Sequence, residues 1–307
     1  MKKYLIKIIL FFVAIMVVDI LFGIVCQYMN DHSKGGGVKS RYYVCKESNE
    51  DVLIFGSSRA KHHYVPDVIE DSLHMTCYNT GEDGNGIIMC YGFLKMITER
   101  YTPKLIIYDV TGYDIYEDDN MKYLDLMKPY YYEKGIDSIF WSVEPKTRLM
   151  MLSNLYRYNT TCLRVIGNYI HPMTNYPKGY SPMYKTMDYE PENKEESEKA
   201  VDTLKIHYFE EFIQLAKDKS VSLVCCVSPS YKAPADDNKY QSIKSLCEQY
   251  QVPFLYYGSD TNISCKKTYF QDRTHMNDDG ARIYTGKLMS WIKNYLVFKK
   301  NDNNTTT

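Results

Sequence analysis

The 307-residue sequence has no surplus of either charge, with 37 Lys and Arg residues against 38 Asp and Glu residues. The net charge of -1 offers no basic surface to hold a nucleic-acid backbone, so we expect no nucleic-acid partner. The sequence also contains no internal repeat. Hydrophobic residues make up 45% of the chain and charged residues 24%, which is ordinary for a globular protein with a substantial core.

The nine cysteines lack any C-x-x-C spacing. Their odd number and irregular placement argue against a disulfide scaffold, and we expect most of them to be small buried hydrophobic side chains. The adjacent His62 and His63 would point apart on a helix, and no cysteine or acidic residue has ligand spacing to them. We therefore expect neither a metal nor another cofactor.

Tryptophan is scarce, with 2 residues, whereas tyrosine is abundant, with 31 residues against 11 Phe. Tyrosine combines an apolar ring with a hydrogen-bonding tip, which suits surfaces that face sugars. The same side chain also fills half-buried positions in many cores. Composition alone leaves both interpretations open.

A long apolar run near the N-terminus extends from Ile8 to Cys26 and is broken only by Asp19. Its length approaches the roughly 20 residues that a helix needs to cross a bilayer. A cleaved signal peptide is the alternative, but no A-x-A-like cleavage pattern follows the run. We expect residues 1–30 to be a transmembrane anchor that contacts the membrane through residues 4–26. An acidic residue within a span is costly in lipid, so Asp19 suggests a partner helix or a water-exposed position.

The basic residues on the two sides of the span nearly balance, so the positive-inside rule does not fix the orientation. The large domain that follows the span favours a single-pass membrane protein with its globular domain on the extracytoplasmic side.

After a juxtamembrane linker at residues 31–50, whose glycines suggest flexibility, short apolar runs alternate with helical patterns. The expected strands are 52–55, 75–78, 105–108, 221–227 and 254–257. This alternation predicts an α/β fold, a three-layer sandwich with a mostly parallel five-stranded sheet, over residues 51–297. This alternation of strands and helices is absent from about 116–200, a segment that we interpret as an insertion or cap on the sheet. The polar tail at 298–307 is expected to be disordered.

Two short motifs fall where such sheets place their chemistry, at the carboxyl ends of strands. Gly56-Ser57-Ser58-Arg59 ends the first strand, so Ser58 Oγ could enter a cleft with its backbone N–H near a helix N-terminus. Gly-Ser-Ser is also a common turn. Downstream, Asp272 could accept the Nδ1–H of His275, which leaves Nε2 free to act as a base towards a serine. Asn277 or Asp278 could instead merely cap the following helix.

A third motif, Asn79-Thr80-Gly81-Glu82-Asp83-Gly84, follows the second expected strand. Its glycines would let a backbone N–H approach a substrate oxygen. A nucleotide-binding loop is the weaker interpretation, because the motif follows the second strand and lacks the expected acidic residue.

In this order the three motifs resemble the SGNH (GDSL-like) hydrolase superfamily, and the N-terminal span resembles a membrane-anchored branch of it associated with O-acylation of envelope polysaccharides. The resemblance implies a flavodoxin-like sheet, a Ser58 nucleophile with Asp272 and His275, and oxyanion donors at Ser58 and Gly84. It implies an esterase or O-acyltransferase acting on acylated cell-envelope glycans or another ester.

Two further residues are candidates for substrate contact. Asn79 lies in the third motif, and Arg59 follows the expected nucleophile. Arg59 could bind an anionic substrate, although a structural salt bridge is an equal alternative.

The sequence departs from the family after the third strand, where Asp109-Val110-Thr111-Gly112-Tyr113-Asp114 lacks the asparagine that usually donates to the oxyanion. Loss of one such donor lowers the rate by roughly a hundredfold or more, unless Thr111 substitutes for it. A weak or inactive SGNH-fold assembly factor is therefore the alternative. It would bind a membrane acyltransferase or a polysaccharide, and Asp19 would favour such a partner.

Overall fold

The computed structural model describes residues 1–171, 176–191, 199–235 and 238–305. The chain forms two compact units. One combines Met1–Glu47 with Asp119–Asn175, and we call it the N-terminal unit. The other combines Ser48–Asp118 with Tyr176–Thr307, and we call it the sheet unit.

The sheet unit is built on five parallel strands in the order β2-β1-β3-β4-β5. The strands are β1 (Val52–Gly56), β2 (Cys77–Asn79), β3 (Leu105–Asp109), β4 (Ser222–Val227) and β5 (Phe254–Tyr256). This confirms the α/β sandwich that the sequence predicts. Because β2 lies on one side of β1 and β3 on the other, the carboxyl ends of β1 and β3 form the crevice where such sheets bind ligands.

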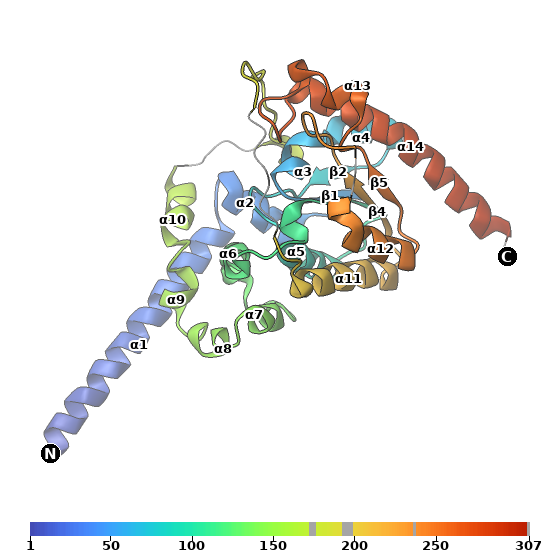
Figure 1. Cartoon of the computed structure of the whole chain (residues 1–307). Coiled ribbons are helices and arrows are strands. Elements are labelled where there is room, and N and C mark those ends of the chain that lie inside the picture. Colours follow the sequence, from blue (N-terminus) through green and yellow to red (C-terminus); the bar gives the residue numbers. More distant parts are fainter. Residues whose placement is uncertain (172–175, 192–198, 236–237, 306–307) are drawn as a thin grey trace. The chain divides into compact units, whose positions relative to one another are not determined.

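Helices cover both faces of this sheet (Figure 1). On one face lie α3 (Ser58–His63), α4 (Pro66–Leu73) and α14 (Asp278–Thr305), and on the other α5 (Ile87–Thr98), α11 (Thr203–Asp218) and α12 (Gln241–Gln249). Short turns occupy the connections: η2 (Gly112–Asp114), η4 (Pro177–Gly179), η5 (Asn238–Tyr240), α13 (Thr261–Ser264) and η6 (Lys267–Tyr269).

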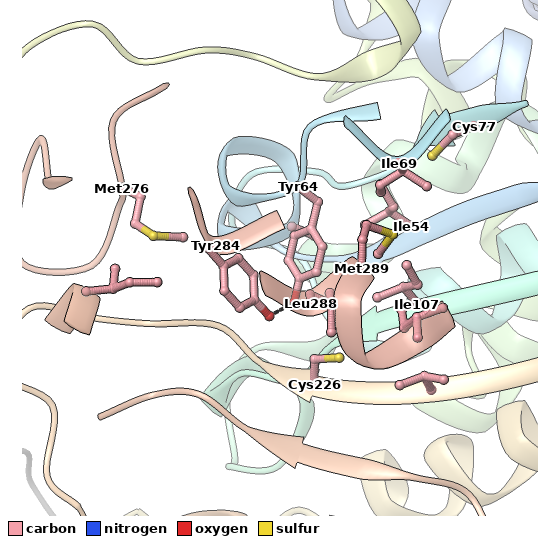
Figure 2. Packing of buried hydrophobic residues seen from close by; sticks show 14 of the residues in the cluster. Ile54, Tyr64, Ile69, Cys77, Ile107, Cys226, Met276, Tyr284, Leu288 and Met289 are labelled. Atoms are coloured by element: carbon pink, nitrogen blue, oxygen red, sulfur yellow. Dashed lines mark hydrogen bonds between the residues drawn. The ribbon is translucent and has the colours of Figure 1, made fainter. Parts of the chain in front are cut away.

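The core follows from the alternation of side chains along each strand. On the α14 face, Ile54 and Ile107 pack in one cluster with Tyr64 and Tyr284, whose hydroxyls lie 3.1 Å apart (Figure 2). On the α11 face, Tyr108 packs edge-on against Phe212. Burial on both faces explains why the strands are continuous apolar runs.

Helix α14 corrects the expected disordered tail at 298–307, because it continues to Thr305. Residues 306–307 lie outside the described residues. Once a helix is established, each further residue adds a backbone hydrogen bond, so a polar sequence can extend it.

The N-terminal unit is helical. Its elements are α1 (Lys2–Asp31), α2 (Gly36–Tyr42), the π-helical turn η1 (Tyr43–Glu47), α6 (Asn120–Leu124), η3 (Asp125–Tyr130), α7 (Asp137–Val143), α8 (Thr147–Met150), α9 (Asn154–Tyr158) and α10 (Cys162–Ile170). Among the described residues, α1 alone is long and apolar enough to cross a membrane, with a mean hydropathy of 3.1 over its most apolar 18 residues. Signal sequences share these properties.

The expected flexible linker at residues 31–50 is also corrected, because α2 and η1 give most of this segment a regular structure. Val38, Val44 and Cys45 are buried. Their burial in the N-terminal unit stabilises these turns, which glycine content alone does not reveal.

Asp19 has its partners within the chain, so it needs no helix from another protein. Its carboxylate accepts hydrogen bonds from Ser153 Oγ at 2.8 Å, from Asn154 N and Nδ2 at 2.9 Å, and from Leu155 N at 2.8 Å. These N–H groups belong to the start of α9, so Asp19 supplies an acceptor that the helix lacks.

The segment at 116–200, expected as one insertion, is divided between the two units, which corrects its boundaries. Asp119–Asn175 belongs to the N-terminal unit because α9 and α10 pack against α1. Tyr176 onwards belongs to the sheet unit, where Met187 N–H donates to Phe270 O at 2.7 Å. Residues 172–175 and 192–198 lie outside the described residues.

Candidate active site

Ser58 is the first residue of α3 and directly follows a tight turn at the end of β1. Gly56 has φ +137, and a Cβ there would lie 2.7 Å from Asp109 O, so only glycine fits between the two strands. Ser57 is extended and precedes the helix. The backbone N–H of Ser58 therefore lies in the first turn of α3, where N–H groups have no partner within the helix.

Ser58, His275 and Asp272 are brought together as a Ser-His-Asp set. His275 Nε2 lies 2.8 Å from Ser58 Oγ, and His275 Nδ1 lies 2.9 and 3.1 Å from the two Asp272 oxygens. The carboxylate can only accept, so Nδ1 carries the proton and Nε2 is free to accept the Ser58 hydroxyl proton. This arrangement can activate a serine as a nucleophile.

The Asp272 carboxylate is held by its own loop. Its Oδ1 accepts from the backbone N–H groups of Thr274 at 2.8 Å and His275 at 2.9 Å. Partial burial raises the pKa of Asp272, but the hydrogen bonds from His275 and Thr274 lower it, and the net pKa is below the usual value. The carboxylate therefore stays ionised and orients the imidazole.

Behind this set lies a buried polar network at the ends of β3 and β4. Asp109 Oδ1 accepts from Tyr64 Oη at 2.7 Å and from Ser228 N at 2.9 Å. Arg59 Nε lies 3.4 Å from Asp109 Oδ2 and donates to Ser228 Oγ at 3.1 Å. Burial opposes the charge of Arg59, but Asp109 more than offsets it and the pKa of the guanidinium is raised. Arg59 thus forms the structural salt bridge that the sequence left as an alternative.

His63 connects α3 to the loop that carries His275. It is fully buried, its Nδ1 lies 2.8 Å from Ser228 Oγ, and its Nε2 accepts from Met276 N at 2.9 Å. Burial and the charge of Arg59 lower the pKa of His63 well below its usual value, so the ring is neutral. His63 therefore ties the residue after His275 to the helix of Ser58.

His62 points elsewhere. Its Nδ1 donates to Ser181 O at 2.6 Å, its Nε2 lies 3.4 Å from Asp83 Oδ1, and its ring packs edge-on against His275. Within the described part of the chain, no three His, Cys, Asp or Glu side chains form a group that could hold a metal ion. His62 instead supports the imidazole of His275 by packing.

Asn79 does not face a substrate, which corrects its expected role. It is 2% exposed, its Nδ2 donates to Ala60 O at 2.7 Å and Tyr64 O at 2.9 Å, and its Oδ1 accepts from Gly81 N at 3.0 Å. The bonds to Ala60 and Tyr64 hold the end of β2 against α3 and the residue that follows it, and the bond from Gly81 shapes the loop that follows β2. The side chain is thus a structural brace.

Gly84 lies in the turn that follows, with φ +64 and open space where a Cβ would be. Glu82 N–H donates to Gly56 O at 3.3 Å, which holds this loop beside the turn of Ser58. Asp83 is fixed to Lys61 Nζ at 2.7 Å. The loop therefore runs along α3, and its glycine can present a backbone N–H.

Thr111 is not free to replace the missing asparagine, because its hydroxyl donates to Asp114 Oδ2 at 3.1 Å. The same oxygen accepts from Thr111 N at 2.7 Å, and Tyr108 Oη donates to Oδ1 at 2.7 Å. Complete burial of Asp114 raises its pKa to about 6 despite these bonds. The Thr111 side chain caps η2, which corrects its possible role as an oxyanion donor.

A cleft of about 840 Å³ is lined by chain neighbours of the Ser-His-Asp set, although Ser58, Asp272 and His275 are not among its lining residues. Arg59, Arg273 and Thr274 line it, and each is a chain neighbour of one member of the set. Its aromatic lining consists of Tyr113, Tyr116, Tyr231, Tyr240 and Tyr256. Such a surface offers both ring faces and hydroxyls to a ligand.

The sequence interpretation missed Asp109, Ser228 and the role of His63. Asp109 and Ser228 were detectable in principle, because Asp109 ends the buried strand β3 and Ser228 directly follows the buried strand β4 of a parallel sheet. The role of His63 had no such signal. It depends on a contact with Met276, which is remote in the chain.

No protein-family model matches the chain, and no curated protein matches it. Among solved structures it is similar to an acetyl xylan esterase, with a TM-score of 0.43 and 12% identity over 78% of this chain and 98% of that one. It is also similar to a GDSL-like lipase from Bacteroides thetaiotaomicron, with a TM-score of 0.35 and 10% identity over 78% of this chain and 88% of that one. At this level of identity, activity must follow from the side chains at the site.

Proposed function

We propose that the chain is a membrane-anchored serine esterase or O-acyltransferase of the SGNH kind, acting on acylated cell-envelope glycans. The observation that supports this most strongly is the 2.8 Å contact between His275 Nε2 and Ser58 Oγ, with Nδ1 held by Asp272. Nucleophile, base and orienting carboxylate stand in the order that acyl transfer requires.

In the first step, Ser58 Oγ attacks the acyl carbonyl carbon while His275 Nε2 takes the hydroxyl proton. The resulting imidazolium is stabilised by the ionised Asp272 and returns the proton to the leaving alkoxide, which leaves an acyl-serine. Water or a sugar hydroxyl then attacks this ester while His275 Nε2 takes its proton. The acyl–Oγ bond breaks, and His275 returns the proton to Ser58 Oγ as the acid or the new ester is released. No cofactor is required.

The negative charge on the carbonyl oxygen needs donors. The Ser58 backbone N–H is the first, because it lies in the first turn of α3. The Gly84 N–H is the second, since Gly84 has no side chain and its turn lies beside α3. With Thr111 committed to Asp114, the rate rests on these two backbone donors.

The glycan substrate is supported by the tyrosine-lined cleft, whose lining includes Arg59, the residue after Ser58. Tyrosine rings stack on the apolar faces of sugars, and their hydroxyls bond to sugar hydroxyls. The anchor is supported by the length and hydropathy of α1. We place the sheet unit on the extracytoplasmic side, where envelope glycans are found.

An inactive assembly factor is the second candidate. The observation in its favour is that the Thr111 hydroxyl donates to Asp114, so Thr111 does not replace the asparagine that would donate to the oxyanion. The assembly factor's partner would be a membrane acyltransferase. Asp19 no longer argues for it, because its hydrogen bonds are made within the chain.

Hydrolysis of p-nitrophenyl acetate by purified protein tests the proposal. Ser58→Ala should lower kcat by about 10⁴-fold or more, and Asp272→Asn by roughly 10²- to 10⁴-fold because the base is present but poorly oriented. Ser57→Ala is the matched control, since Ser57 Oγ is buried with no hydrogen-bond partner and its loss should leave activity and stability intact. Wild-type activity no higher than that of Ser58→Ala would instead favour the second candidate.

A further inference from the structure

Helices α9 and α10, which pack on α1, and the preceding segment that includes α8 carry several uncovered apolar side chains. Their exposures are 76% for Leu149, 67% for Leu152, 46% for Leu155 and 81% for Leu163. A single exposed leucine is ordinary, but a group on consecutive short helices marks an interaction surface. We call these four residues the leucine face.

Asp19 shows where along α1 the helix α9, which carries part of the leucine face, begins. It accepts from Asn154 N and Leu155 N at the start of α9. A Cβ on Gly23 would overlap the Asn154 side chain, so α9 rests directly on the helix one turn further on. Asp19 lies about 10 Å before Cys26, the end of the apolar run, at 1.5 Å per residue.

The part of α1 that is exposed on every side is too short to cross a bilayer by itself. Tyr4–Val18 is exposed throughout and spans about 22 Å at 1.5 Å per residue. The hydrocarbon core is about 30 Å thick. If α1 spans the membrane, the hydrocarbon must therefore extend past Asp19 and reach the level at which α9 begins.

The charged residues around the leucine face are compatible with a position at the boundary between hydrocarbon and lipid headgroups. The Asp19 carboxylate has four donors from α9 and the residue before it, which compensates for its removal from water. Arg148 and Arg164 are exposed on the same helices, and the Arg148 guanidinium lies 4.3 Å from the Trp141 ring. Cations and tryptophan are typical of the headgroup layer.

We propose that α8, α9 and the start of α10 form a second membrane-inserted element, with the acyl chains of the bilayer covering the leucine face. Arg148 and Arg164 then reach anionic lipid headgroups. This inference rests on the proposed anchor, because α1 sets the depth of the helices. The chain would hold the membrane through a span and an interfacial helical segment together.

Tryptophan quenching by brominated lipid tests the proposal on the full chain. Trp141→Phe and Trp291→Phe provide a background without tryptophan, into which one of Leu152→Trp, Leu163→Trp or Phe11→Trp is introduced. The protein is reconstituted in vesicles of phosphatidylglycerol and acyl-brominated phosphatidylcholine. Both leucine-face variants should lose fluorescence severalfold relative to vesicles without bromine. Tyr184→Trp, at a position of the sheet unit that is 79% exposed, is the control for tryptophan in water and should change little.

The outcomes separate the inference from the anchor on which it rests. Quenching of Phe11→Trp without quenching of Leu152→Trp and Leu163→Trp leaves the anchor standing and overturns the inference, and the leucine face would then belong to a protein partner. Failure of Phe11→Trp to be quenched removes the anchor and the inference with it. Leucine-face quenching equal to that of the Tyr184→Trp control also overturns the inserted element.

Discussion

His63 occupies one tautomer, because each ring nitrogen has a single fixed partner. Met276 N–H requires an unprotonated Nε2, so Nδ1 carries the proton and donates to Ser228 Oγ. Protonation of Nε2 would break the bond to Met276 and bury a charge near Arg59. The neutral state of one imidazole thus maintains the link between the helix of Ser58 and the loop of His275.

The lowered pKa of His63 predicts that the protein loses stability in acid. Below about pH 6.5 the unfolded chain gains a proton at His63 and the folded chain does not, so the free energy of unfolding falls with pH down to the folded pKa. Above pH 6.5 both states are neutral and His63 has no effect. His63→Gln keeps an acceptor for Met276 N–H and should flatten the pH dependence, measured by urea denaturation.

The buried Asp114 has the opposite effect on how the free energy of unfolding depends on pH. Its pKa is raised from 3.8 to about 6, so its contribution to stability is present below pH 3.8 and is lost as pH rises through 6. This contribution is common to wild type and His63→Gln. An identical pH dependence in the two proteins would therefore show that His63 is not buried in its neutral form.

At the scale of elements, the ends of β3 and β4 depend on the ion pair between Asp109 and Arg59. Asp109→Ala leaves Arg59 buried without its carboxylate and should lower the free energy of unfolding by about 3–5 kcal/mol. Asp109→Asn keeps an acceptor for Tyr64 and Ser228 and should have a smaller effect. Denaturation followed by the fluorescence of Trp291 measures both. A change below about 1 kcal/mol for Asp109→Ala would mean that the pair is not desolvated.

Helix α9 depends on Asp19 for its start. Asp19→Leu removes the acceptor of Asn154 N–H and Leu155 N–H, and loss of a cap costs about 0.5–2 kcal/mol. Hydrogen exchange should become several times faster at α9, while α7 exchanges as before. Unchanged exchange at α9 would contradict the capping role.

The sequence predicts elements well where their pattern is local. Each strand is a short apolar run, so four of the five were located to within one residue at each end. The edge strand β2 was placed about two residues early, because Met75 continues the apolar pattern without pairing. Asp19 could not be assigned a partner, since α9 lies far along the chain and carries no complementary motif.

At the scale of the whole molecule, the candidate site joins residues that are 217 positions apart. Their meeting could be predicted because parallel sheets gather the ends of their strands at one edge. The roles of Asn79 and Thr111 could not, because a polar side chain near a site can face the substrate or brace the loops. Only the hydrogen bonds to Ala60 and Asp114 distinguish the two.

The proposed function requires that Ser58 is an activated serine. Reaction with a fluorophosphonate, followed by peptide mapping in a mass spectrometer, tests it directly. We expect one adduct on Ser58, none in Ser58→Ala, and a severe loss in His275→Ala at an unchanged melting temperature. A folded wild-type protein that takes up no label, or an adduct that maps to Ser57, would show that Ser58 is not the activated nucleophile.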